Sequence, residues 1–184
     1  MTLYKETFRI ESTRLKGWDY RSPGWYFVTV CAGKKRCVFG EIEQGEMHFS
    51  ALGATAHSQM ETLPGHYSNV LVDSFVVMPN HVHAIIVIEG RHRYSPPAGI
   101  MAAPSKAGEG SGPPKAGSLS AIVRSYKAGV TKWAHEHGFE EFAWQERFHD
   151  HILRTNDAVN RTRDYIQDNP VNWTNDELHP AERT

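Results

Sequence analysis

The sequence predicts an α+β domain in which helices cover one face of an antiparallel sheet. Segments with the two-residue alternation of strands are interspersed with segments of helical spacing. Two strong strand segments follow each other across a short turn, which favours an antiparallel pair. The chain has 184 residues, of which 40% are hydrophobic and 22% charged, as in one globular domain.

The expected strands are rich in β-branched and aromatic residues and end at turn residues. In chain order they are Tyr26–Ala32, Cys37–Ile42, Met47–Phe49, Val70–Met78, His81–Ile88 and Phe142–Leu153. The Gln44-Gly45 and Pro79-Asn80 dipeptides mark the turns of two hairpins. The second hairpin has the strongest strand pattern in the chain.

The expected helices carry apolar residues at helical spacing, over Ala54–Leu63, Ser118–His137 and Asn156–Asp168. Ser118 or Ser120 would cap the second helix. Asn156 or Asp157 would cap the third, and Pro170 would end it.

Residues 95–117 are mostly Pro, Gly, Ala, Ser and Lys, a composition that predicts a flexible insertion. We expect one domain over residues 1–175, with this insertion and a basic N-terminal stretch, followed by a tail over residues 176–184.

Three features predict a soluble, cytoplasmic protein. Cys31 and Cys37 are too few for the disulfide framework of a secreted domain. The N-terminus lacks the apolar core of a signal peptide. The longest apolar run, Ala84–Ile88, is far shorter than the roughly 20 residues of a membrane span.

The charge of the chain is unevenly distributed. The net charge is −1, so the chain as a whole does not favour a polyanionic partner. Residues 1–36 carry eight basic and three acidic side chains, whereas residues 155–184 carry three basic and six acidic ones. This asymmetry would orient a nucleic acid, unless the two ends are simply solvated.

Three histidine pairs have the His-x-His spacing: His81/His83, His135/His137 and His149/His151. Residues at this spacing share a face only on a strand. The first pair lies on an expected strand whose other face is apolar, so its imidazoles can bind one divalent cation with a third ligand from elsewhere. The second pair falls at a helix end, and the face of the third is ambiguous. The alternative for the first pair is a polar surface without a metal.

The last expected helix offers the missing groups. Tyr165 and Asn169 are four residues apart and share a helical face. A tyrosine phenol near a metal can act as a covalent nucleophile, and the Asn169 amide oxygen can complete the metal site. Because Pro170 disfavours helical dihedrals at Asn169, Asp168 is the rival ligand. Alternatively, Tyr165 is a half-buried aromatic of the helix surface.

Four motifs occur in the order of a known family. Val76–His83 resembles the His-hydrophobic-His (HUH) motif of the single-tyrosine HUH transposases. Tyr165–Pro170 with Trp173 is similar to the YIxxNPxxxW helix end of their REP-associated tyrosine transposase branch. Between them, Arg124–Lys127 and Trp144–Arg154 resemble the central helix and the following strand of that branch. The resemblance covers roughly residues 20 to 173.

The resemblance implies a ferredoxin-like α+β HUH endonuclease domain, an antiparallel sheet with helices packed on it, in which the HUH strand faces the tyrosine helix. It implies a Mg²⁺- or Mn²⁺-dependent endonuclease and strand transferase. Such an enzyme, a monomer or homodimer, cuts and rejoins single-stranded DNA at hairpin or repeat sequences through a 5′-phosphotyrosine. Carried onto this chain, His81, His83 and Asn169 match the metal ligands and Tyr165 the nucleophile.

Single-stranded DNA binding requires cationic side chains near the phosphates and aromatic rings near the bases. The candidates for DNA contact are Arg14, Lys16, Arg21, Arg124 and Lys127.

Other functions stay open at this point. A non-catalytic module that binds DNA or RNA hairpins would keep the fold and the basic patches without needing the histidines or Tyr165. A histidine-triad phosphoesterase also carries a His-x-His strand, but it needs a further histidine where this chain has Ile85. Relaxases and replication initiators share HUH chemistry, but they usually place the tyrosine ahead of the HUH strand or use a pair.

Overall fold

The computed structural model describes residues 3–4, 7–8, 15, 17–90 and 116–180. Nearly all of the expected insertion at 95–117 lies outside the described residues, and so do Arg14 and Lys16.

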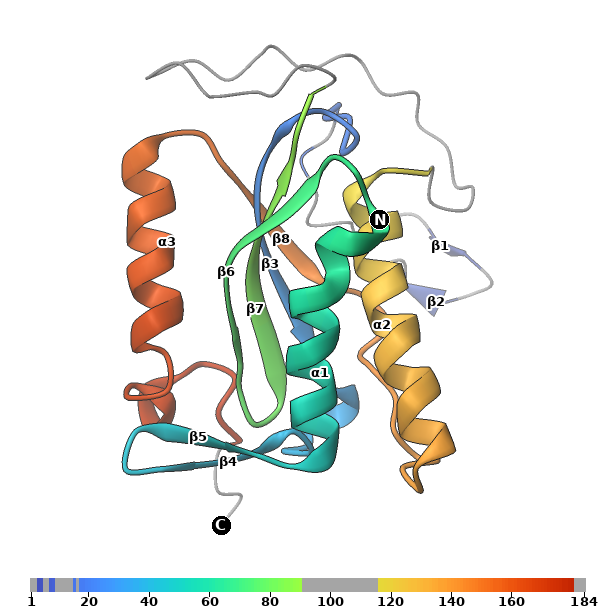
Figure 1. The fold of residues 1–184 in the computed structure, drawn as a ribbon, viewed down its shortest axis with the longest axis vertical. Coiled ribbons are helices and arrows are strands. Elements are labelled where there is room, and N and C mark those ends of the chain that lie inside the picture. Colours follow the sequence, from blue (N-terminus) through green and yellow to red (C-terminus); the bar gives the residue numbers. More distant parts are fainter. Residues whose placement is uncertain (1–2, 5–6, 9–14, 16, 91–115, 181–184) are drawn as a thin grey trace.

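The described residues form a four-stranded sheet, two two-stranded sheets and three α-helices (Figure 1). The strands are β1 (Leu3–Tyr4), β2 (Thr7–Phe8), β3 (Gly24–Cys31), β4 (Gly40–Glu43), β5 (Glu46–Phe49), β6 (Val70–Val77), β7 (His81–Ile88) and β8 (His149–Leu153). The α-helices are α1 (Ala51–Thr62), α2 (Leu119–Glu136) and α3 (Asn156–Asp168), and the 3₁₀ helices are η1 (Gly33–Lys35), η2 (Leu63–His66) and η3 (Trp173–Asn175). None of these helices is both long and apolar enough to cross a bilayer.

The four-stranded sheet has the order β6-β7-β3-β8, and each neighbouring pair in it is antiparallel. Along the chain its elements follow as β3, α1, β6, β7, α2 and β8, with the β4–β5 hairpin inserted after β3. This βαββαβ order is that of a ferredoxin-like domain. The predicted α+β class is confirmed.

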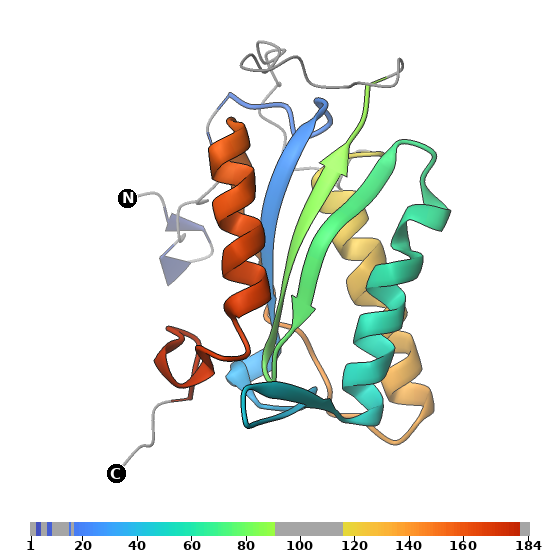
Figure 2. The same cartoon turned by 60° about the vertical axis from the view of Figure 1, so that its left-hand side comes forward.

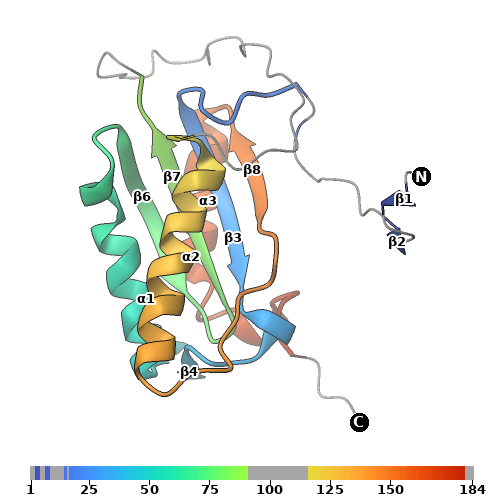
Figure 3. The ribbon, with the colours of Figure 1, turned by 90° about the vertical axis from the view of Figure 1, so that its right-hand side faces the viewer.

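Helices lie on both faces of the sheet, not on one as the sequence suggested. The pair α1 and α2 covers one face and α3 covers the other, so the sheet stands between them (Figures 2 and 3). The reason is that α3 has a buried apolar side of its own, with Val159 and Ile166, which needs a second apolar surface.

Two hydrophobic cores result, one on each side of the sheet. All eight residues of β7 are buried, because both of its faces are covered. Val82, Ala84 and Ile86 belong to the larger core with α1 and α2, whereas Ile85 packs with Ile166 of α3 in the smaller one. The apolar face predicted for this strand is confirmed, and the histidines lie on the other face.

Each α-helix begins at a hydroxyl side chain that accepts a backbone N–H. Ser50 caps α1, Ser118 caps α2 and Thr155 caps α3, at 3.0, 3.3 and 3.1 Å. The predicted cap Ser118 is confirmed. The prediction of Asn156 or Asp157 was wrong, because the hydroxyl of Thr155 already takes the N–H of the first turn.

The last strand begins at His149 and not at the predicted Phe142. Phe142 is buried and packs edge-on against Phe39, with ring centroids 5.9 Å apart. The Trp144 indole donates to the Lys127 carbonyl of α2 at 3.1 Å. Phe142 and Trp144 therefore pack into the larger core, and pairing beyond β3 is reduced there to the isolated Ala32–Trp144 bridge.

Candidate functional site

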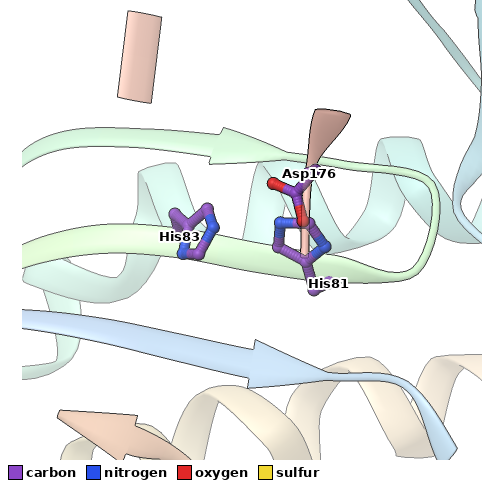
Figure 4. A group of neighbouring side chains, drawn as sticks. All are labelled: His81, His83 and Asp176. Atoms are coloured by element: carbon purple, nitrogen blue, oxygen red, sulfur yellow. The ribbon is translucent and has the colours of Figure 1, made fainter. Parts of the chain in front are cut away.

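His81 and His83 lie on the face of β7 that is turned toward α3. Their exposed fractions are 0% and 3%. The strand register places them opposite Cys31 and Thr29 of β3. The two imidazole rings are neighbours, with centroids 4.4 Å apart, and they form the base of the candidate site (Figure 4).

The Asn80 side chain determines which nitrogen of His81 carries a proton. Its amide nitrogen donates to the carbonyls of Leu178 and Lys35, at 2.7 and 3.3 Å. Asn80 Oδ1 is therefore the acceptor in the 2.8 Å hydrogen bond with His81 Nδ1. His81 Nε2 keeps its lone pair, and it is buried without a hydrogen-bond partner among the described residues.

Burial keeps both imidazoles neutral. Loss of solvation lowers the pKa of His81 and of His83 to about 3. The nearby Lys35 charge adds to this shift of the pKa at His81, and His81 itself adds to it at His83. Neutral imidazole is the form that binds metal ions, so both side chains are available as ligands at neutral pH.

Tyr165 of α3 brings its hydroxyl to His83. Tyr165 Oη lies 3.2 Å from His83 Nε2, and the ring packs edge-on against Phe27 with centroids 6.0 Å apart. The residue is 46% exposed, so a large ligand can reach the hydroxyl. Partial burial and, secondly, the Asp176 carboxylate raise the pKa of Tyr165, which leaves the phenol protonated at neutral pH.

Asn169 lies one helical turn after Tyr165 and is 3% exposed. It ends α3 with φ −58° and ψ −44°, so the expectation that Pro170 draws it out of the helical region was wrong. Proline disfavours this conformation without forbidding it. Asn169 Oδ1 is buried without a partner in the described part of the chain. Asp168, the rival ligand, is exposed on the helix surface.

The structure adds Asp176, a site residue that the sequence reasoning missed. One ligand atom of Asp176 lies within 4.8 Å of one each from His81 and His83 (Figure 4). The chain turns back through η3, where the Trp173 ring lies 6.0 Å from that of His81. Leu178 N donates to Asp176 Oδ1 at 2.6 Å and orients the carboxylate. Asp176 has no periodic relation to the motif, and its place shortly after Trp173 was the one signal available.

The donor set suits a divalent cation. It consists of two imidazole nitrogens and a carboxylate, from His81, His83 and Asp176. The Asn169 amide lies beside it, because Asn169 Nδ2 donates to Asp176 Oδ2 at 3.3 Å. Two acceptor atoms here, His81 Nε2 and Asn169 Oδ1, are buried and make no hydrogen bond to the described residues. Each such orphaned acceptor costs roughly 1–3 kcal/mol. A cation bound at His81, His83 and Asp176 would satisfy the His81 acceptor.

Of the predicted DNA-contact residues, the three that the structure describes, Arg21, Arg124 and Lys127, have contacts away from this cluster. Arg21 forms an ion pair with Asp19 at 2.5 Å. Arg124 and Lys127 belong to α2, which lies on the opposite face of the sheet from α3 (Figure 3). Lys127 Nζ donates to the Gln145 carbonyl at 2.6 Å.

The histidine pair at the end of α2 has separate contacts. His135 Nε2 lies 3.0 Å from the Phe142 carbonyl oxygen, and the His137 ring stacks on Trp133 at 4.1 Å between centroids. The sequence predicted that the rings of His135 and His137 do not share one face, and their separate contacts agree with this prediction.

Comparison with known proteins finds a related sequence and a similar solved structure. No protein-family model matches the chain. An uncharacterized protein of Haemophilus influenzae is 36% identical over 172 residues, which cover 91% of this chain and 92% of that protein. The solved structure of a REP-associated tyrosine transposase bound to a REP hairpin has a TM-score of 0.56 and 17% identity, and the match covers 89% of this chain and 74% of that one. This chain therefore belongs to the family of the Haemophilus protein and has the fold of a REP-associated tyrosine transposase.

Proposed function

We propose that the protein is a metal-dependent endonuclease and strand transferase that cuts and rejoins single-stranded DNA at hairpin or repeat sequences in the cytoplasm. The observation that carries the proposal is the 3.2 Å approach of Tyr165 Oη to His83 Nε2, beside buried cation ligands. A hydroxyl nucleophile next to such ligands is what phosphoryl transfer by a tyrosine requires.

In the proposed reaction, Tyr165 Oη attacks a backbone phosphorus and the bond from phosphorus to the 3′ oxygen breaks. The tyrosine loses its proton, and the departing oxygen takes one up. The products are a 5′-phosphotyrosine and a free 3′-hydroxyl. One phosphodiester replaces another, so attack by a 3′-hydroxyl can rejoin the strand without ATP.

The four ligands His81, His83, Asp176 and Asn169 would hold Mg²⁺ or Mn²⁺. Oxygen ligands suit both ions, and two imidazoles favour Mn²⁺. A cation held there would polarise a non-bridging phosphate oxygen and offset the charge that develops during phosphoryl transfer.

The proposed partner is a hairpin-forming single strand. The transposase with this fold was solved with a REP hairpin. In the present chain Tyr165 and the two histidines come from one polypeptide, so a monomer suffices for the chemistry.

The test is incubation with Mn²⁺ and single-stranded oligonucleotides that contain the hairpins flanking the protein's own gene. We expect a covalent adduct that survives denaturing electrophoresis. Tyr165→Phe should abolish the adduct but keep the fold and hairpin binding, because the ring contact with Phe27 remains. Binding without any adduct would instead favour a non-catalytic hairpin-binding module.

A further inference from the structure

The histidines of β8 lie on the same face of the sheet as the candidate site. The register pairs Thr29 of β3 with His83 on one side and with His149 on the other. Directly opposed residues of an antiparallel ladder point to the same face. His83, Thr29 and His149 therefore form one row across three strands. The next row places His151 beside Phe27, the ring that contacts Tyr165.

The opposite orientation of Ile152 supports this assignment. Ile152 follows His151 in β8 and is buried in the larger core, on the side of α1 and α2. Since neighbouring residues of a strand point to opposite faces, His151 and His149 are directed to the side of α3. The register thus resolves the face that the sequence left ambiguous.

Both β8 histidines are exposed. β8 is an edge strand (Figure 3). α3 lies over the sheet face, packs mainly on β6 and β7, and is fixed to β6 by the ion pair of Arg163 with Asp73. Neither His149 nor His151 makes a hydrogen bond, ion pair or ring contact with the described residues. Within the part of the chain that the structure describes, their ring nitrogens are therefore free for a ligand.

A second metal site does not explain these histidines. In the described ranges, His81, His83 and Asp176 are the group of three ligating side chains whose atoms come within 4.8 Å of one another. His149 and His151 belong to no such group. Two imidazoles without a third ligand suit a different partner.

We infer that His149 and His151 bind the DNA strand that carries the phosphate attacked by Tyr165. The inference rests on the proposed function and assigns a binding surface to it. Neighbouring strands are about 4.8 Å apart, so His149 lies roughly 10 Å from His83 along the row. That separation spans about one to three nucleotides of a strand. Imidazole N–H groups donate to phosphate oxygens, and the rings stack on bases.

The experiment compares affinities in a cleavage-defective background. The double variant His149→Ala/His151→Ala is made in the Tyr165→Phe protein, and binding to the fluorescently labelled hairpin oligonucleotide is measured by anisotropy. We expect about tenfold weaker binding from the lost hydrogen bonds and stacking. His149→Gln/His151→Gln should recover part of the affinity, because the amide keeps a donor. The control His66→Ala removes an exposed histidine of η2 and should bind normally.

A second arm locates the contact. Oligonucleotides with single methylphosphonate linkages are scanned along the strand, and the difference between wild-type and variant histidines should vanish when a phosphate within about three nucleotides of the cleavage site is neutralised. Equal affinities of the alanine variant and the His66 control would overturn the inference, while an adduct with the unmodified protein would still support the chemistry of Tyr165. Absence of that adduct would overturn the proposed function, and the affinity ratio would still decide the role of the β8 histidines.

Discussion

At the scale of single residues, His81 and His83 differ from the exposed histidines because they are buried and can both bind one cation. We predict that His81→Ala and His83→Ala each abolish Mn²⁺ binding in calorimetric titrations, because each removes one of two nitrogen ligands at the base of the site. Matched controls are His135→Ala and His137→Ala, whose rings contact other groups at the end of α2. Retained Mn²⁺ binding in the double variant of the first pair would remove these histidines from the metal site.

Asp176 supplies the anionic ligand of the proposed set. Asp176→Asn keeps the shape but removes the charge, and we predict about a tenfold or larger loss of Mn²⁺ affinity with little change in hairpin binding. The adjacent exposed acid Glu177 provides the control, because Glu177→Gln removes the same charge one residue away. An equal loss of Mn²⁺ affinity in both variants would show that the effect comes from removing a nearby negative charge and not from removing a ligand.

The two buried imidazoles also predict how stability depends on pH. Their folded-state pKa is about 3, whereas the ordinary value is 6.5, so below pH 6.5 the unfolded chain binds more protons than the folded one. The free energy of unfolding should therefore fall as the pH is lowered from about 6.5 toward 3. Thermal melts with EDTA should show this loss, and His81→Gln/His83→Gln should show less of it. An equal loss of stability with falling pH in the wild type and in His81→Gln/His83→Gln would contradict the lowered pKa of the two histidines.

At the scale of elements, the position of α3 determines where the Tyr165 hydroxyl lies. The Arg163 guanidinium binds both carboxylate oxygens of Asp73, at 2.8 and 2.6 Å, and lies 5.4 Å from the Trp25 ring centre. Asp73 occupies the irregular register of β6, where the strand bulges. The contact therefore joins α3 to two strands of the sheet.

We predict that Asp73→Asn slows adduct formation several-fold at saturating DNA, because the helix loses a bidentate contact that positions Tyr165. The free energy of unfolding should fall by only about 0.5–1 kcal/mol, since the pair is partly exposed. Lys132→Gln, which breaks the exposed pair of Lys132 with Glu136, is the control and should leave the rate unchanged. An unchanged rate in Asp73→Asn would show that packing alone holds α3.

Strands and helices with a strong hydrophobic periodicity could be predicted from the sequence, whereas the contacts between these elements could not. The β7 pattern of His81 and His83 opposite Val82 and Ala84 follows from two-residue alternation, and the structure has the same faces. The prediction that β8 starts at Phe142 was wrong, because apolar residues that pair in a sheet and apolar residues that fill a core have the same sequence pattern. The expectation that Asn169 leaves the helical region was wrong because the residue before a proline has a preference against that region and not a prohibition.

At the scale of the whole molecule, the sheet has the larger hydrophobic core on one face and the candidate site on the other. The face under α1 and α2 carries the larger core, and the face under α3 carries His81 and His83, with Tyr165 of α3 beside His83. Asp176 reaches this second face through a turn after α3, a long-range contact to His81 and His83 that no local pattern encodes. The basic residues of α2 lie on the first face, so the charge pattern alone did not locate the site.

The central claim is that Tyr165 becomes covalently joined to DNA. The most direct measurement digests the protein–DNA adduct with nuclease and protease and maps the modified peptide by tandem mass spectrometry. The account predicts a nucleotide attached through its 5′-phosphate to Tyr165, on a peptide that contains part of α3. A nucleotide attached to another side chain, or free 5′-phosphate ends without any attached peptide, would contradict it.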